Sequence, residues 1–135
     1  MSSTLKIFNT QLLNFSSAMS ERFPTNRDLK VALTGLKTLS SMNPKKTMEL
    51  FLTYTYKYRD IVMSKDEQRL INTDFSVDLK QCKEIVENPE NTNEVIETLR
   101  KNWTELSSEE KDNIWKYLQV LMTLTDKHIA ESLGK

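Results

Sequence analysis

Apolar residues recur at spacings of three and four through most of this chain, which is the period of an amphipathic α-helix. The first such run covers residues 4–22, and Phe23-Pro24 ends it because the residue before a proline avoids helical backbone angles. A second run begins at Thr25-Asn26 and continues to Met42. Each run predicts one helix with a single apolar face.

Residues 44–62 carry two conflicting patterns. Tyrosines alternate with threonine and lysine over residues 53–58, as on a β-strand. However, Asn43 is a favourable N-cap, Pro44 suits the first helical position, and the apolar residues from Met48 to Val62 keep a helical spacing. No other segment alternates in this way, so a strand here would have no partner. We therefore predict helix throughout 44–62, with packing overriding the local β preference of Tyr and Thr.

Three or four further helices follow. Ser64 with Glu67 resembles a capping box before a short helix over residues 66–72. Apolar spacing predicts another helix over about 77–88, ended by Asn88-Pro89, and one more from residue 92 or 93 to about 104. The last helix has the clearest signals, with Ser107 as cap, Glu110 three residues later and an apolar face that reaches residue 129.

Composition supports the same fold class. The 135 residues include only two glycines and three prolines, whereas a sheet-rich protein needs many tight turns. The chain is also long enough to bury a core of its own. We predict an all-α protein, a compact bundle of about five or six short helices with no sheet, in a single domain that spans residues 1–135.

Cysteine content and hydropathy bear on the compartment. The single cysteine, Cys82, excludes an internal disulfide framework, and the first residues lack the apolar run of a signal peptide. No stretch approaches the ~18 consecutive apolar residues of a transmembrane helix. We expect an intracellular protein that is not secreted and not inserted in a membrane.

The net charge of zero conceals an asymmetry between the two halves. Residues 1–65 hold ten Lys/Arg and four Asp/Glu, a balance of +6, and residues 66–135 hold nine and fifteen, a balance of −6. The halves can neutralise one another within one fold. Alternatively, they form a bipolar surface that steers a partner or joins copies of the chain.

The sequence offers little for catalysis. His128 is the only histidine, no Cys/His cluster has zinc-ligand spacing, and Gly35 and Gly134 are too far apart for a phosphate-binding loop. Asp74 and Asp78 are one helical turn apart and are the best pair for a divalent ion, but acidic pairs are usually solvated. We predict no enzyme activity, no catalytic or metal-binding residue, no cofactor and no small-molecule substrate.

Two groups of residues are candidates for binding. The first is aromatic, because tryptophans serve either a core or a partner interface, and it comprises Trp103, Trp115 and Tyr117. The second is basic and surrounds the tyrosine-rich segment, where cations and aromatic rings together suit nucleic acid: Lys45, Lys46, Lys57 and Arg59. The overall pI is about 6.6, whereas a nucleic-acid-binding domain usually has an excess of basic residues and a higher pI. We therefore favour a protein partner or self-association over nucleic acid.

The stretch "KNWTELSSEEKDNIWKYLQVLMTL", residues 101–124, resembles the C-terminal signature of a family of short, largely uncharacterised proteins of large nucleocytoplasmic DNA viruses, including algal and giant viruses. The residues that carry this resemblance are Trp103, Leu106, Ser107, Lys111, Ile114, Trp115, Lys116, Tyr117, Leu118 and Leu121. "FP" at 23–24, "NPKK" at 43–46 and Phe51 give weaker support. The resemblance implies a helical viral protein and supplies no catalytic residue.

The expected function is a non-enzymatic interaction or structural protein of a large DNA virus, in the host cytoplasm or as a virion component. An alternative is an adaptor that holds a helix of a host protein in a groove, as viral apoptosis regulators do. A third is a nucleic-acid-associated protein.

Overall fold

The structure is a computed structural model that describes residues 3–73 and 92–134. Within these ranges the chain is helical and no residue belongs to a strand, which confirms the predicted all-α bundle. The helices are α1 (Ser3–Arg22), α2 (Arg27–Met42), α3 (Pro44–Tyr54), η1 (Tyr56–Tyr58, a 3-10 helix), α4 (Arg59–Ser64), α5 (Glu67–Asn72), α7 (Thr92–Thr104) and α8 (Ser108–Leu133).

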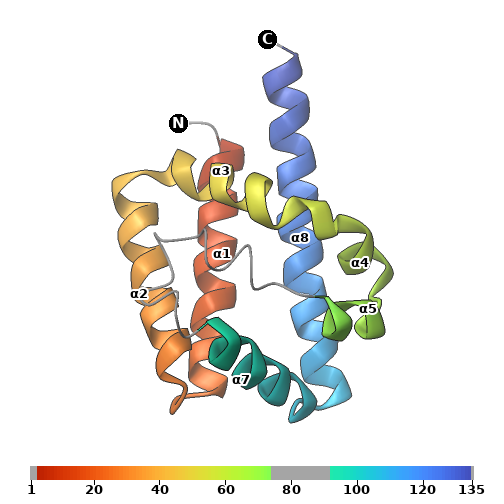
Figure 1. The fold of residues 1–135 in the computed structure, drawn as a ribbon. Coiled ribbons are helices and arrows are strands. Elements are labelled where there is room, and N and C mark those ends of the chain that lie inside the picture. Colours follow the sequence, from red (N-terminus) through yellow and green to blue (C-terminus); the bar gives the residue numbers. More distant parts are fainter. Residues whose placement is uncertain (1–2, 74–91, 135) are drawn as a thin grey trace.

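The two longest helices, α1 and α8, form the centre of the bundle. They run in opposite directions side by side, with α2 flanking α1 and with α3 and α7 crossing near the two ends (Figure 1). The main core lies where α1, α3 and α8 meet, and its fully buried side chains include Phe8, Met48, Leu121 and Met122. A smaller cluster, Phe23 with Leu106 and Ile114, closes the end where α7 turns into α8.

Three predicted helix starts are confirmed by their capping hydrogen bonds. The side-chain oxygen of Asn26 accepts from the Leu29 amide, and that of Asn43 accepts from Lys46 with Pro44 at the first helical position. Ser107 and Glu110 form the reciprocal capping box at the start of α8. In each case a short polar side chain satisfies an amide that the first helical turn leaves without a backbone partner.

The continuous helix predicted over 44–62 is wrong in one respect, because the helix breaks after Tyr54. Thr55 keeps its amide bond to Phe51, but the chain then tightens into η1 before α4 begins at Arg59. The break lies inside the segment whose Tyr/Thr alternation opposed the helical pattern. A contact from far along the chain accompanies it: the Tyr56 hydroxyl and the Arg59 guanidinium both bind Asp126 of α8.

The predicted Ser64–Glu67 capping box is also wrong. Ser64 is the last residue of α4, and its hydroxyl donates to the carbonyl of Asp60. The cap of α5 is Asp66, whose carboxylate accepts from the Arg69 amide at 3.2 Å. Between them, Lys65 takes a left-handed conformation (φ 54°), which ends α4 and turns the chain sharply into α5.

A buried polar side chain joins α1, α2 and α3. The Asn9 amide nitrogen donates to the carbonyls of Leu5 (2.8 Å) and Pro44 (3.0 Å). Its oxygen accepts from the hydroxyls of Ser40 (2.9 Å) and Thr47. Asn9 is only 6% exposed, so these bonds replace water around a buried amide and fix how the three helices meet.

Candidate functional site

The predicted aromatic residues lie mostly inside the protein. Trp115 is 4% exposed, and its ring meets that of Trp103 edge to face with 5.5 Å between centroids. Trp103 is half-buried, and its indole N–H donates to Glu67 at 2.8 Å. Tyr117 is half-buried against Phe15. Trp115 therefore supports the core, and Trp103 has an internal hydrogen-bond partner.

The four predicted basic residues do not converge on one surface. Lys45 and Lys46 lie in the first turn of α3, whereas Lys57 lies in η1 beyond the other end of that helix. Arg59 is engaged with α8, since its guanidinium nitrogens lie 2.8–3.2 Å from the carboxylate of Asp126. Lys57 lines a cavity.

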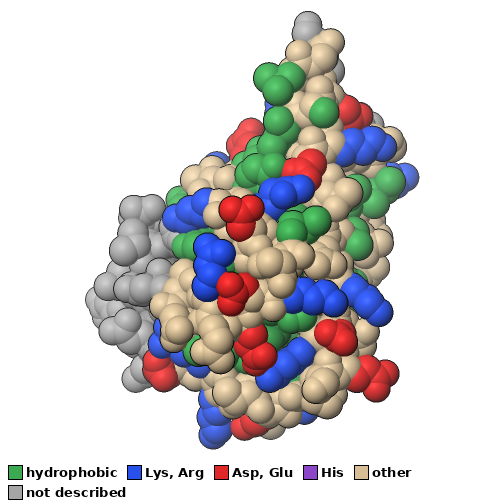
Figure 2. All heavy atoms as spheres, turned by 90° about the vertical axis from the view of Figure 1, so that its right-hand side faces the viewer, with side chains coloured by type: hydrophobic (Ala, Val, Ile, Leu, Met, Phe, Trp, Pro, Cys, Tyr) green, Lys and Arg blue, Asp and Glu red, His purple; other side chains and the backbone are tan. Residues whose placement is uncertain are grey.

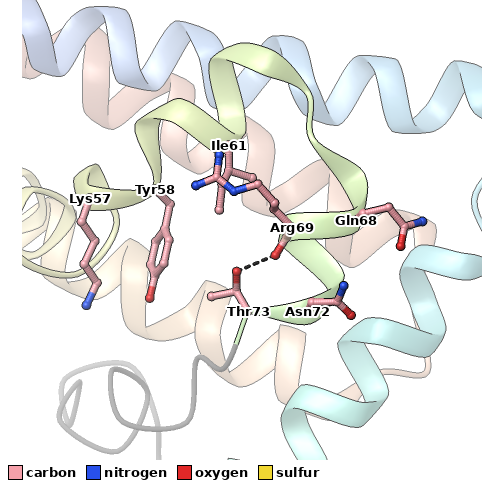
Figure 3. Close-up of a pocket in the computed structure, with 7 residues that line it drawn as sticks. All are labelled: Lys57, Tyr58, Ile61, Gln68, Arg69, Asn72 and Thr73. Atoms are coloured by element: carbon pink, nitrogen blue, oxygen red, sulfur yellow. Dashed lines mark hydrogen bonds between the residues drawn. The ribbon is translucent and has the colours of Figure 1, made fainter.

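That cavity is an open groove of about 560 Å³ on the α4–α5 side of the bundle. We call it the α4–α5 groove; it is lined by Lys57, Tyr58, Ile61, Gln68, Arg69, Asn72 and Thr73. Lys57 and Tyr58 project side by side from η1, and Arg69 reaches from α5 toward Ile61 on the other side of Tyr58 (Figure 3). Gln68 and Asn72 extend from α5 on the side away from Tyr58 (Figure 3).

The η1–α4 wall of the groove is attached to α8 through Asp126. Hydrogen bonds from Arg59, with a further one from Tyr56, lower the pKa of the Asp126 carboxyl. The same hydrogen bond to Asp126, with burial, raises the pKa of the Tyr56 hydroxyl. Asp126 is therefore ionised at neutral pH and holds two residues of the broken helix at once.

The α5 wall is attached to α7 and α8. Glu67 accepts hydrogen bonds from the Lys111 ammonium (2.7 Å) and the Trp103 indole, and these two bonds lower the pKa of its carboxyl. At the other end of α5, the Arg100 guanidinium donates to the carbonyl of Thr73 at 3.2 Å. Asp126 thus fixes the η1–α4 wall to α8, and Glu67 fixes the α5 wall to α7 and α8. The Thr73 carbonyl, which accepts from Arg100, belongs to a residue that lines the groove.

A second exposed feature is the end of α8, which extends past the other helices (Figure 1). With 26 residues, α8 is about 39 Å long, against about 30 Å for the 20 residues of α1. Ile129 and Leu133 follow the fully buried Thr125 at intervals of one turn, so they continue its face of the helix. Ile129 is half-buried and Leu133 is 83% exposed, and Figure 2 shows hydrophobic side chains along this projecting end.

Charges of both signs are interspersed on the face shown in Figure 2. Several ion pairs join the basic first half to the acidic second half: Arg22 with Glu110, Arg59 with Asp126 (2.8 Å), and Lys65 with Asp112 (3.9 Å). These pairs are consistent with neutralisation within the fold, the first of the two interpretations of the charge asymmetry.

The sequence alone identified only Lys57 among the residues that line the groove. A usable signal was present on α5, where Gln68/Asn72 and Arg69/Thr73 form two neighbouring polar rows at i, i+4 spacing. Asp74 and Asp78, considered above for metal binding, and the single cysteine, Cys82, lie outside the described residues. Within those residues, no three His, Cys, Asp or Glu side chains converge on a metal site, and no helix has the length and apolar character needed to cross a membrane.

Comparison with known proteins gives no match to a protein-family model, a curated protein or a solved structure.

Proposed function

We propose that this chain is a small, non-enzymatic helical interaction or structural protein of a large DNA virus, and that it acts as a virion component. The observation that carries the interaction role is the projecting end of α8. There the apolar face that builds the core continues into solvent as Ile129 and Leu133.

A helix that presents one apolar face is suited to pack on a helix or groove of another protein. Fully burying a leucine side chain stabilises a complex by about 2 kcal/mol. Leu133 is 83% exposed, so most of this stabilisation is still available to a partner. We propose the last two turns of α8 as the partner-binding element, either for another viral protein or for a second copy of the chain.

The viral setting is supported only by the resemblance of residues 101–124. The residues that carry it build the corner between α7 and α8: Trp103 packs on Trp115, Ser107 caps α8, and Leu106 meets Ile114. The resemblance therefore supports a shared way of folding this corner, and the interaction role depends on the end of α8.

The alternatives receive less support. An adaptor for an amphipathic helix needs a groove with a largely apolar lining, whereas most residues that line the α4–α5 groove are polar or charged. A nucleic-acid surface needs cations gathered on one face, and the four predicted ones are divided between α3, η1 and an ion pair with Asp126.

The test combines particle analysis with a matched pair of double variants. Ile129→Gln/Leu133→Gln removes the apolar face of the α8 end. Lys127→Gln/Glu131→Gln changes two positions with the same spacing on other faces and leaves the net charge unchanged. We expect the wild type and the second variant to copurify with purified particles at fixed stoichiometry, and the first variant to be lost from them.

Sedimentation of the purified protein tells a second copy of the chain from another viral partner. If both variants are incorporated equally, the α8 end is not the binding element. If the wild-type protein is abundant in infected cells but absent from particles, the virion role is wrong and the host-adaptor alternative replaces it.

A further inference from the structure

We infer that the outer face of α2 binds the phosphate backbone of duplex DNA without reading its base sequence. We call this face the α2 stripe, and its exposed side chains are Arg27, Lys30, Thr34, Lys37, Thr38 and Ser41. Its cations differ from the four that the sequence suggested for nucleic acid. The inference concerns a different part of the bundle from the end of α8 and does not depend on the proposed function.

Helical geometry gathers the six side chains of the α2 stripe on one face. The positions follow one another at intervals of one, three or four residues, so they span an arc of about 100° on a helix with 3.6 residues per turn. All six are exposed. The helix lies at the edge of the bundle and packs on α1 and α3, so these contacts leave its outer face open to a partner (Figure 1).

The α2 stripe is positively charged. Its charged side chains, Arg27, Lys30 and Lys37, are all cations. Within the part of the chain that the structure describes, none of the three forms an ion pair, whereas three other cations of the first half are paired with α8. Residues 27–46 contain five Lys/Arg and one Asp/Glu, a balance of +4 out of the +6 of residues 1–65. Most of the basic excess of the first half therefore lies on α2 and the start of α3.

Duplex DNA matches this surface in length and charge. Arg27 and Lys37 are ten residues apart, which is about 15 Å along a helix. A duplex carries one negative charge per about 1.7 Å of its axis, so the same length presents about nine, and each cation can meet a separate phosphate. The side chains between the cations are short. The hydroxyls of Thr34 and Thr38 donate to carbonyls of their own helix at 2.9 and 3.0 Å, so they do not obstruct a partner.

Other anionic partners fit the α2 stripe less well. A single strand of nucleic acid is held by bases that stack on aromatic rings, and none of the six side chains is aromatic. A protein interface needs an apolar core, and a membrane surface needs an apolar helix face that can be buried in it. Met42, at the end of α2, is 80% exposed, but one apolar side chain supplies neither.

The experiment measures binding of the full chain to a fluorescently labelled duplex of about 20 base pairs, by fluorescence anisotropy at about 20–200 mM salt. The test variant is Arg27→Gln/Lys30→Gln/Lys37→Gln, which removes the three cations of the α2 stripe. Glutamine forms helices about as well as lysine and arginine, so α2 should be retained. Circular dichroism and thermal unfolding check that each variant is folded.

The matched control removes the same charge elsewhere on the bundle. It is Lys101→Gln/Lys116→Gln/Lys127→Gln, at three exposed positions of α7 and α8. A loss of affinity that follows only from the lower net charge would be the same in both triple variants. A second duplex of unrelated sequence tests whether the bases are read.

We expect the logarithm of the affinity to fall with the logarithm of the salt concentration with a slope of about −2.7, or about −0.9 for each of three phosphate contacts. Between about 50 and 200 mM salt this is a loss of about 40-fold. The α2 variant should lose most of this slope, and Lys30→Gln or Lys37→Gln alone about 0.9 of it. The control should bind within about twofold of the wild type, and so should the two duplexes relative to each other.

Several results would overturn the inference. They are no binding to the duplex at low salt, binding that does not weaken as salt rises, and equal losses in the two triple variants. Tighter binding to a polyglutamate peptide or to phosphatidylserine vesicles than to the duplex would also overturn it, because the partner would then be an acidic protein or a membrane surface.

Discussion

Replacing Asn9 with alanine removes the amide that connects α1, α2 and α3, and its cost can be worked out bond by bond. Three of its four partners keep another bond. The Leu5 carbonyl remains in the α1 hydrogen-bond ladder, and the Thr47 hydroxyl still donates to the Pro44 carbonyl at 2.7 Å. The bonds that nothing replaces are those from the Ser40 and Thr47 hydroxyls to the Asn9 oxygen. The loss is therefore about two tertiary hydrogen bonds, each worth about 1 kcal/mol, and a small void at a site that is only 6% exposed.

These terms sum to about 2–3 kcal/mol of unfolding free energy. With an unfolding entropy of about 2.1 cal/mol/K per residue, 135 residues give about 0.28 kcal/mol/K, so Tm should fall by about 7–11 °C. Asn14→Ala is the matched control, because it makes the same change at an exposed position of the same helix. Both variants gain the helix propensity of alanine, which cancels in the comparison.

Thermal and urea unfolding would measure this difference, and a double-mutant cycle with Thr47→Val would isolate the bond between the two side chains. We expect a coupling energy of about 1 kcal/mol. The reasoning fails if Asn9→Ala and Asn14→Ala differ by less than about 0.5 kcal/mol, because the network would then add nothing to stability.

Three further predictions concern stability. Trp115→Ala should lower the unfolding free energy by about 3 kcal/mol, since the ring is buried; a urea-unfolding change below about 0.5 kcal/mol would contradict this. Ser107→Ala should cost about 1 kcal/mol through loss of the α8 cap, as measured by thermal unfolding. Because folding lowers the pKa of Glu67, Glu110 and Asp126, their stabilisation is complete above about pH 4.5 and is lost as pH falls through the folded-state pKa. Unfolding at pH 7 and pH 3 should show this loss, reduced in Asp126→Asn.

The helix starts could be predicted because their signals are local. Asn43-Pro44 and Ser107 with Glu110 each act within one helical turn, so a few residues of sequence contain the whole interaction. The break after Tyr54 could not be placed in the same way. It accompanies bonds from Tyr56 and Arg59 to Asp126, 70 and 67 residues along the chain, and no local pattern indicates which carboxylate they meet.

The α4–α5 groove could not be predicted from the sequence for the same reason: it depends on contacts between residues that are far apart in the chain. Its walls come from η1 and α5, and their distance depends on the left-handed turn at Lys65 and on the bonds of Glu67 to Trp103 and Lys111. A lysine in the left-handed region is uncommon, so sequence rules that look for glycine or asparagine at such turns miss it. The cap predicted at Ser64 is wrong because α4 continues to Ser64, and after the turn at Lys65 the cap of α5 is Asp66.

The packing of the two halves against each other brings their opposite charges together. α8 carries acidic residues from the second half and lies against α1 and α4 of the basic first half, so Glu110, Asp112 and Asp126 meet Arg22, Lys65 and Arg59. These pairs are partly exposed and each contributes little to stability. Their larger effect is to bring charges of opposite sign together, so the +6 and −6 balances of the two halves offset each other within the bundle.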